Sequence, residues 1–287
     1  MPWPNETGAM KPTEQKQGDV IKVAVAGAAG RMGQRLINAI VQRQGMLLTG
    51  ALEAQNHPAL GRDAGLVAGA GELGVVITPQ LRQVLEGADV LIDFTVHQAS
   101  MVHLREAVGA KRAIVIGTTG FSQEEWEEIR TIGPGTRCLV SPNMSVGVNV
   151  VLGLLERAAR VLGADYDVEI VEAHHRNKLD APSGTALRMA EVLAMALGRD
   201  LREVGVFARH GQIGPRKAGE IGIQTVRAGD IVGEHTVIFG GLGERIEIVH
   251  RAHSRDNFAR GALRAAAWLV NQPAGLYDMR DALELRE

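Results

Sequence analysis

Short apolar runs alternate with helical patterns from residue 21 to residue 143, and this alternation constrains the fold more than any other feature of the chain. The expected strands are residues 21–27, 46–53, 74–78, 88–95, 112–120 and 136–143, and the expected helices are residues 31–43, 79–86, 97–109 and 122–131. Continuously apolar strands are typical of parallel sheets that are covered on both faces. The alternation therefore predicts an α/β fold with a doubly wound parallel sheet.

The pattern changes after residue 143. Helical spacing continues over residues 146–162 and 184–197, whereas apolar and polar residues alternate over residues 166–175, 221–239 and 244–252. Alternation is typical of a sheet with one buried face, so we expect a second, α+β unit with a mixed or antiparallel sheet. The stretch 221–239 reverses at Ala228-Gly229-Asp230 and predicts a hairpin. A last helix over residues 257–270 is expected to fold back onto the first sheet.

Composition and charge exclude several classes of partner. The 31 basic and 33 acidic residues give a net charge of −2, without a cluster of lysine and arginine, which argues against nucleic-acid binding. No window approaches 18 consecutive apolar residues, so we expect no membrane span. The single cysteine, Cys138, lies in an apolar run and is interpreted as a buried structural residue in a reducing cytoplasm.

The segment GAAGRMG, residues 27–33, joins the first predicted strand to its helix. Its glycines allow a tight turn, a close approach of the backbone to a ligand, and close packing of helix on strand, so that a pyrophosphate can lie at the helix N-terminus. Ala29 stands where the usual fingerprint has its second glycine, which weakens the motif by itself. Glu53 ends the second strand, where an acidic side chain hydrogen-bonds the adenosine ribose, and the combination predicts a dinucleotide site.

Three more loops follow predicted strands, at residues 93–95, 117–120 and 141–144. In an open α/β sheet the ligand lies at the carboxyl ends of the strands, so these small polar residues are placed to contact a ribose or an amide. Each loop taken singly is equally typical of an ordinary turn.

The densest polar run of the chain is EAHHRNKLDAPSGT, residues 172–185, which follows an alternating strand and opens a helix at Pro182. Free N–H groups at a helix start, beside two histidines, an arginine and a lysine, form a site for an anion. A lysine that gives a proton and a histidine that titrates near neutral pH suit the reduction of a conjugated imine that carries carboxylates. The alternative interpretation of any single residue is a charged surface loop.

Several mechanisms lack their sequence motifs. The sequence contains no GxxxxGK[ST], no GxSxG, no Tyr-x-x-x-Lys and no HExxH. The pair His250 and His253 has a spacing that suits a metal, but the alternation places His250 on a strand face, and we interpret it as structural. No metal site is therefore expected.

The blocks GAAGRMG, IDFT, GTTG, SPNMSVGVN, EAHHRNKLDAPSGTAL, TVRAGDIVGEHTV and HSRDNFARGA occur in this order between Ile21 and Val270. In these blocks the chain resembles the 4-hydroxy-tetrahydrodipicolinate reductase family of bacterial lysine and diaminopimelate biosynthesis, formerly called dihydrodipicolinate reductase. The resemblance implies a Rossmann domain completed by the C-terminal helix and a central mixed-sheet domain for substrate and tetramer contacts. It also implies reduction of 4-hydroxy-tetrahydrodipicolinate to tetrahydrodipicolinate with NADH or NADPH.

The resemblance implies roles for individual residues. The proton donors are His174 and Lys178, and the contacts to substrate carboxylates are His175, Gly184 and Thr185. The cofactor contacts are Gly27, Ala28, Ala29, Gly30, Arg31, Met32, Glu53, Gly117, Thr118, Thr119, Ser141, Pro142, Asn143 and Met144. Ala54 follows Glu53 where some members of the family have an arginine for a 2′-phosphate. We therefore expect NADH to be preferred, or at least equal to NADPH.

The expected organisation has three segments. Residues 1–19 are a disordered tail without the apolar stretch of a secretory signal, residues 20–145 with 256–287 bind the dinucleotide, and residues 146–255 bind substrate and form the oligomer. The alternating strands need partners for their edges, and a cytoplasmic homotetramer without nucleic-acid or membrane partners is expected. Two alternatives stay open: another amino-acid or oxo-acid dehydrogenase, and a non-catalytic NAD-sensing protein.

Overall fold

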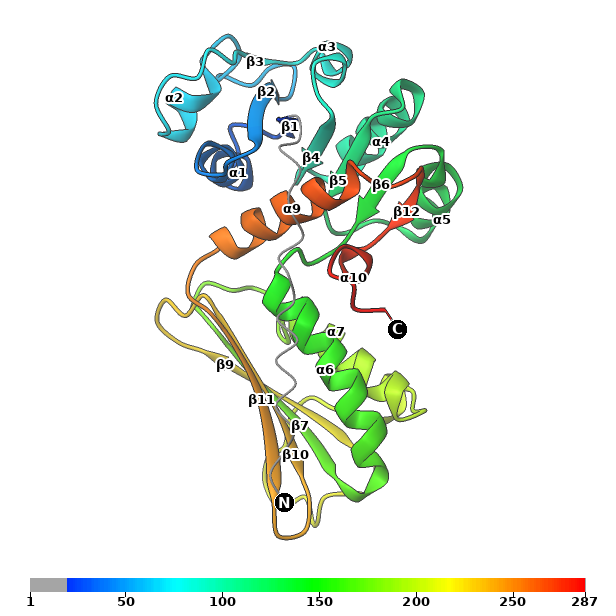
Figure 1. The fold of residues 1–287 in the computed structure, drawn as a ribbon. Helices are drawn as coiled ribbons and strands as arrows, with labels where there is room; N and C mark the ends of the chain where they lie inside the picture. Colours follow the sequence, from blue (N-terminus) through cyan, green and yellow to red (C-terminus); the bar gives the residue numbers. More distant parts are fainter. Residues whose placement is uncertain (1–19, 287) are drawn as a thin grey trace, which may run out of the picture.

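The computed structural model describes residues 20–286, which form two sheets at opposite ends of the molecule (Figure 1). The predicted tail, residues 1–19, lies outside the described residues. The first sheet has seven strands, all paired in parallel, in the order β12-β6-β5-β4-β1-β2-β3. Its strands are β1 (Ile21–Ala26), β2 (Met46–Leu52), β3 (Ile77–Thr78), β4 (Val90–Asp93), β5 (Ala113–Ile116), β6 (Arg137–Val140) and β12 (Gly275–Tyr277). The predicted doubly wound parallel sheet is confirmed.

Helices cover both faces of this sheet. They are α1 (Arg31–Val41), α2 (Ala64–Ala68), α3 (Leu81–Glu86), α4 (His97–Ala110), α5 (Gln123–Ile132), α9 (Asp256–Leu269) and α10 (Met279–Ala282), with a 3-10 turn over Gly133–Gly135. Side chains along β1 alternate between two cores: Val23 and Val25 pack with α1 and α9, and Ala24 and Ala26 pack with α3 and α4. A strand that supplies two cores has no polar face, which is why its sequence is continuously apolar.

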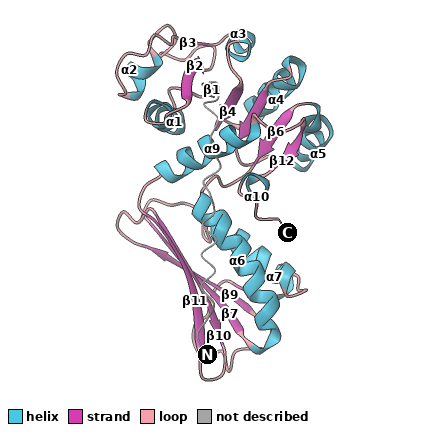
Figure 2. Ribbon diagram, in the orientation of Figure 1, coloured by secondary structure: helices cyan, strands magenta, loops and turns pink. Residues whose placement is uncertain are grey.

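The second sheet is mixed and has the order β11-β10-β7-β9-β8. Its strands are β7 (Asp167–His174), β8 (Gly205–Val206), β9 (Ile221–Arg227), β10 (Gly233–Gly240) and β11 (Arg245–Ala252). Its helices are α6 (Val146–Leu162), α7 (Gly184–Ala196) and α8 (Leu201–Val204), with a 3-10 turn over Gly163–Asp165. A core that includes Leu155, Leu193, Ile170 and Phe239 joins α6 and α7 to one face of the sheet (Figure 2). The predicted second α+β unit is confirmed.

The hairpin predicted over residues 221–239 is wrong. Strand β7 lies between β9 and β10, parallel to β9 and antiparallel to β10. The loop after β9 crosses the end of β7 and pairs with it: Ala228 N–H donates to His174 O at 2.9 Å, and Arg176 N–H donates to Gly229 O at 3.1 Å. The true hairpin joins β10 and β11. Alternation of apolar and polar residues identified which face of each strand is buried. It did not identify the neighbouring strands, because the same alternation is compatible with any strand order.

The chain end returns to the first sheet, as predicted. Helix α9 packs with α1 and belongs to the core beneath β4 and β5. The sequence patterns missed β12, which pairs with β6 at the sheet edge, because three residues are too short for a periodic signal. Cys138 on β6 is fully buried, which raises the pKa of its thiol to about 12, in agreement with its predicted structural role. Between residues 20 and 286, no helix is both long and apolar enough to cross a bilayer.

The contact of α9 with the loop after β6 gives a test of the fold. A Cβ atom at Gly261 of α9 would lie 1.7 Å from the Met144 carbonyl oxygen. Gly261→Ala must therefore push the backbone of α9 away from the backbone of that loop. We expect it to lower the free energy of unfolding by about 1–3 kcal/mol, measured by urea denaturation. Gly109→Ala on α4, where a Cβ meets nothing within 4 Å, should instead raise it by about 0.5–1 kcal/mol. Equal stability of the two variants would contradict this packing.

Candidate active site

The glycine loop has the geometry that the sequence predicted. Gly27 has φ +69°, a conformation that favours glycine, and Gly30 N–H closes the turn on Gly27 O at 2.9 Å. A Cβ atom at Gly33 would lie 2.0 Å from Gly27 O, so helix α1 packs directly on the turn. The N-terminus of α1 therefore opens at the carboxyl end of β1, which is the arrangement that binds a pyrophosphate.

Glu53 reaches this loop from the end of β2. Its Oε2 accepts from Ala29 N–H at 3.0 Å, and its Oε1 accepts from Ala54 N–H at 3.1 Å. The structure thus brings together Glu53 and the glycine loop, although 24 positions separate Glu53 from Ala29. Ala54 offers no cation beside this carboxylate.

Asp93, a buried carboxylate at the end of β4, holds the loops that follow β4 and β5. It accepts from Thr95 N–H at 2.8 Å and lies 2.7 Å from Nδ1 of His103 on α4. Burial alone would raise the pKa of Asp93, but its hydrogen bonds to His103 and Thr95 hold that pKa below its ordinary value. Gly117 N–H donates to Asp93 O at 2.8 Å, so the loops after β4 and β5 are fixed side by side.

Two of the predicted cofactor residues are largely buried. Thr118 and Ser141 are each 5% exposed. The Thr118 hydroxyl accepts from Ser100 at 2.8 Å, and the Ser141 hydroxyl donates to Asn143 O at 2.9 Å. These hydroxyls hold the loops in shape, and the loop backbone lines the carboxyl edge of the sheet. Thr119, between Thr118 and Ser141 in the chain, is exposed.

The predicted cofactor and substrate residues meet at Asn143. Its Nδ2 donates to the Thr185 hydroxyl at 3.1 Å, and its Oδ1 accepts from Ser145 N–H at 2.9 Å. Thr185 lies in the first turn of α7, which begins at Gly184 after the N-cap Ser183. The loop after β6 is therefore bonded to the start of the helix that follows the polar run.

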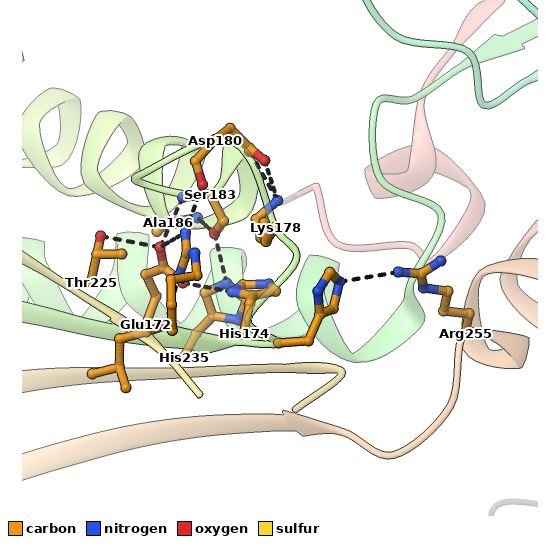
Figure 3. A network of polar contacts seen from close by, with 12 residues as sticks. Glu172, His174, Lys178, Asp180, Ser183, Ala186, Thr225, His235 and Arg255 are labelled. Carbon is orange, nitrogen blue, oxygen red and sulfur yellow. Dashed lines mark hydrogen bonds and ion pairs between the residues drawn. The ribbon is translucent and has the colours of Figure 1, made fainter. Parts of the chain in front are cut away.

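The polar run begins on β7 with Glu172 and His174, two residues apart and therefore on the same face of the strand. Glu172 is fully buried and accepts from Ser183 N–H at 3.1 Å and from the Thr225 hydroxyl at 3.2 Å. Its Oε2 lies 2.5 Å from Nδ1 of His174 (Figure 3). Arg227 on β9 completes the set as a bidentate ion pair, with 2.8 and 2.9 Å contacts.

His175 and Lys178 of the run each have a polar side-chain partner. Lys178 Nζ donates to Asp180 at 2.7 Å, and this bond lowers the pKa of the Asp180 carboxyl. His175 Nε2 lies 3.3 Å from Nη2 of Arg255, which precedes α9 (Figure 3). Arg255 also lines a cleft of about 520 Å³ together with Arg31, Met32 and Phe94. Arg255 therefore belongs both to this cleft beside the glycine loop and, through its contact with His175, to the surroundings of the polar run.

A row of three imidazoles underlies the site. The ring of His235 on β10 lies between His174 and His250, with centroid distances of 5.2 and 6.2 Å. Burial, with the two neighbouring histidines, lowers the pKa of His235 to about 4, so this ring is neutral at neutral pH. Its Nε2 lies 3.1 Å from the Ser183 hydroxyl. His250 lies on strand β11, as the alternation predicted.

Sequence reasoning assigned no role to Glu172, Arg227 or Arg255. The spacing of Glu172 and His174 on an alternating strand was a usable signal, because i and i+2 share a face. Arg227 and Arg255 had no local signal, since their partners lie 55 and 80 positions away. Both arginines lie in recognised sequence blocks, but their contacts with Glu172 and His175 form only in the folded protein.

Comparisons with known proteins agree with this geometry. The family model described as "Dihydrodipicolinate reductase, N-terminus" matches residues 21–144, and the model described as "Dihydrodipicolinate reductase, C-terminus" matches residues 147–283. The chain is 57% identical over 267 residues to the 4-hydroxy-tetrahydrodipicolinate reductase of Syntrophus aciditrophicus (strain SB), covering 93% of this chain and 100% of that protein. It is also 57% identical over 268 residues to the enzyme of the same name from Pelobacter propionicus, with the same coverage.

One solved structure is similar over nearly the whole chain. It is the dipicolinate-bound dihydrodipicolinate reductase from Paenisporosarcina sp. TG-14, with a TM-score of 0.70 and 25% sequence identity. The match covers 90% of this chain and 97% of that one.

Proposed function

Because this chain belongs to the dihydrodipicolinate reductase family, we propose that it reduces 4-hydroxy-tetrahydrodipicolinate to tetrahydrodipicolinate with NADH or NADPH, in lysine and diaminopimelate biosynthesis. The observation that carries the proposal is the bond between Asn143 and Thr185, which joins a dinucleotide-type loop to a cationic polar site. A reductase needs its cofactor and an acid group within reach of one substrate, and this bond joins the loop assigned to the cofactor to the start of the helix assigned to the substrate.

The cofactor side fits the residues that the sequence predicted. The turn at Gly27 to Met32, with the N-terminus of α1, would hold the pyrophosphate, and Glu53 would accept hydrogen bonds from the ribose. The loop backbones at Gly117 to Thr119 and Ser141 to Met144 would surround the nicotinamide. A Cβ atom at Gly117 would lie 2.3 Å from the Phe94 ring. Only glycine therefore allows the loop backbone to pack against this ring. The bound cofactor would supply the hydride.

The substrate side is suited to a dicarboxylate. The first turn of α7, at Gly184 and Thr185, offers backbone N–H groups to one carboxylate, and His175 supplies a side-chain contact. Lys178 is our choice for the acid, because a cationic ammonium both stabilises the negative charge that follows hydride addition and quenches it with a proton. Asp180 would hold this ammonium toward the site. His174 would serve as the second proton-transfer group.

We also propose that residues 20–145 with 256–287 form the cofactor domain of a cytoplasmic enzyme, and that residues 146–255 form the substrate and oligomerisation domain. Helices α6 and α7 cover one face of the second sheet. The other face carries Val226 and Val249, which are 43% and 39% exposed. Exposed valines on the open face of a sheet are suited to contact with a second copy of the chain, and support a homotetramer.

A cofactor-oxidation assay tests the proposed substrate and the proposed proton donors. Cofactor oxidation should require the cyclic dicarboxylate made from pyruvate and aspartate semialdehyde, and simple amino acids should not replace it. Lys178→Ala should lower kcat by about 10²- to 10⁴-fold, with a smaller change in cofactor affinity, and His174→Gln should behave similarly. Lys22→Ala, at an exposed lysine of β1, is the control. Wild-type turnover in both site variants would remove the catalytic assignment.

A second prediction concerns cofactor choice. The Glu53 carboxylate should repel the roughly −2 charge of a 2′-phosphate, and Ala54 provides no guanidinium, so NADH should bind as tightly as NADPH or more tightly. Ala54→Arg should shift the ratio of dissociation constants toward NADPH, measured by titration at two salt concentrations. A wild-type preference for NADPH above about tenfold, or 1.4 kcal/mol, would show that other cations such as Arg31 or Arg62 outweigh Glu53.

A third prediction concerns assembly. Light scattering at micromolar concentration should give about four times the 30.7 kDa chain mass. Val249→Lys, which adds a charge to the open sheet face, should reduce this mass. Val102→Lys, at an exposed apolar position of α4, should leave it unchanged. A wild-type monomer would contradict the tetramer without affecting the chemistry.

A further inference from the structure

Glu172 lies directly behind His174 and is completely enclosed by protein. Its exposed fraction is 0%, and its Oε2 is 2.5 Å from Nδ1 of His174 (Figure 3). Arg227 donates to both carboxylate oxygens, at 2.9 and 2.8 Å. The carboxylate therefore has a guanidinium on one side and the imidazole on the other.

The ionisation of this carboxylate decides which nitrogen of His174 carries hydrogen. Burial alone would raise the pKa of Glu172, but hydrogen bonds from Arg227 and His174 outweigh burial and hold the pKa below its ordinary value. An ionised carboxylate can only accept, so Nδ1 of His174 must be the donor. In the neutral imidazole, Nε2 then carries the free lone pair.

The backbone leaves space beside that second nitrogen. A Cβ atom at Gly233 on β10 would lie 3.0 Å from Nε2 of His174 and 3.4 Å from its Cδ2. Any side chain at position 233 would therefore press on the reactive edge of the ring. Glycine at this position keeps Nε2 accessible.

We propose that Glu172, held by Arg227, is a positioning residue that fixes the Nδ1–H tautomer of His174, so that His174 exchanges hydrogen bonds and protons with the substrate only through Nε2. The inference rests on the proposed function for the catalytic role of His174. The same carboxylate accepts from Ser183 N–H, the N-cap of α7. The buried Glu172 carboxylate therefore fixes the orientation of the His174 ring. It also fixes the position of the first turn of α7, which we assign to the substrate carboxylate.

Burial and three charged groups set the titration of His174. Glu172 on the same strand favours the imidazolium, whereas Lys178 on the following loop and Arg227 on β9 disfavour it. His235, the facing group on β10, is neutral. Burial, the largest influence, lowers the pKa of His174 below its ordinary value. Removing Glu172 leaves two cations beside the ring, and removing Arg227 leaves the anion opposed by Lys178 alone, so the two changes act on the titration in opposite directions.

Nitrogen-15 NMR of the histidine rings tests this directly, with the His174 signal assigned through His174→Gln. In the wild-type chain, Nδ1 should be protonated and Nε2 should be the unprotonated nitrogen. The pKa of His174 should fall in Glu172→Gln and rise in Arg227→Gln. The double variant, which removes both charges together, should return it toward the wild-type value. Wild-type protonation on Nε2, or shifts in the same direction in both single variants, would overturn the proposal.

Kinetics supply the second readout. Glu172→Gln should lower kcat by about 10²-fold or more, with the KM for the cofactor nearly unchanged, and the His174 inflection of the kcat–pH profile should follow the NMR titration. Unchanged kcat in Glu172→Gln would contradict a positioning role. Wild-type protein without turnover would instead contradict the proposed function, while the NMR result would still stand.

The same strand offers a matched control. Glu169, on the opposite face of β7, is also a paired carboxylate, with Arg209 at 2.7 Å and Arg216 at 3.0 Å, but it makes no contact with His174 among the described residues. Glu169→Gln should lose stability through its broken ion pairs and leave the tautomer and pKa of His174 unchanged. A shift of His174 in this control equal to that in Glu172→Gln would reduce Glu172 to a structural residue.

Discussion

The parallel sheet must be covered on both faces, and the rest of the architecture depends on how this chain meets that requirement. Helices α3, α4 and α5 cover one face, but α1 alone leaves the other face partly open. Helix α9 fills it, with fully buried alanines and leucines such as Ala262, Ala266 and Leu269. Because α9 comes from the far end of the chain, the whole second unit is inserted between β6 and α9 and is tethered at both ends.

This double tether explains why the two halves of the site face one another. The loop after β6 leads into α6, and Arg255 stands immediately before α9. Both connections therefore pass the carboxyl edge of the first sheet, where the glycine loop and the loops after β4 and β5 lie. Charges at this junction are paired: Asp93 with His103, Glu172 with Arg227, and Lys178 with Asp180. Buried carboxylates that are held in this way keep fixed orientations, because an unpaired charge in the interior costs several kcal/mol.

Local patterns predicted the elements of this fold better than their neighbours. The helix expected over residues 146–162 has these bounds in the structure, because its apolar spacing and its Ser145 cap are local properties. The order of β9, β7 and β10 was not predictable in this way, since two alternating strands around a turn are equally consistent with a hairpin and with a crossing over a third strand. Strand β3 is only two residues long, although its apolar run suggested five, because pairing with β2 involves only Ile77 and Thr78.

The site residues also separate into those that local sequence predicted and those that depend on tertiary contacts. The glycine loop and Glu53 were predictable, because a strand, a turn and a helix in sequence place them at one sheet edge. The partners of the polar run were not, because Arg227 and Arg255 reach it only through tertiary structure. The roles of the buried hydroxyls stay predictions: Thr118 and Ser141 have the residue types of ligand contacts, and their side chains also bond within the protein. A polar side chain at a loop has the same sequence signature in either role.

The loop from Ser141 to Ser145 is held by contacts to three helices. Asn143 O accepts from both Ser141 Oγ and Asn149 Nδ2, its side chain bonds Ser145 and Thr185, and the backbone of Met144 lies against Gly261. Apart from the bond to Ser141, these contacts come from α6 with its cap, from α7 and from α9, so a displacement of any of these helices moves the joint between the two units. Hydride transfer depends on reacting atoms held about 3–3.5 Å apart, and a misplacement of 1 Å can cost about 10²-fold in rate. Rigidity at this joint is therefore as much a requirement of the chemistry as the acid groups beside it.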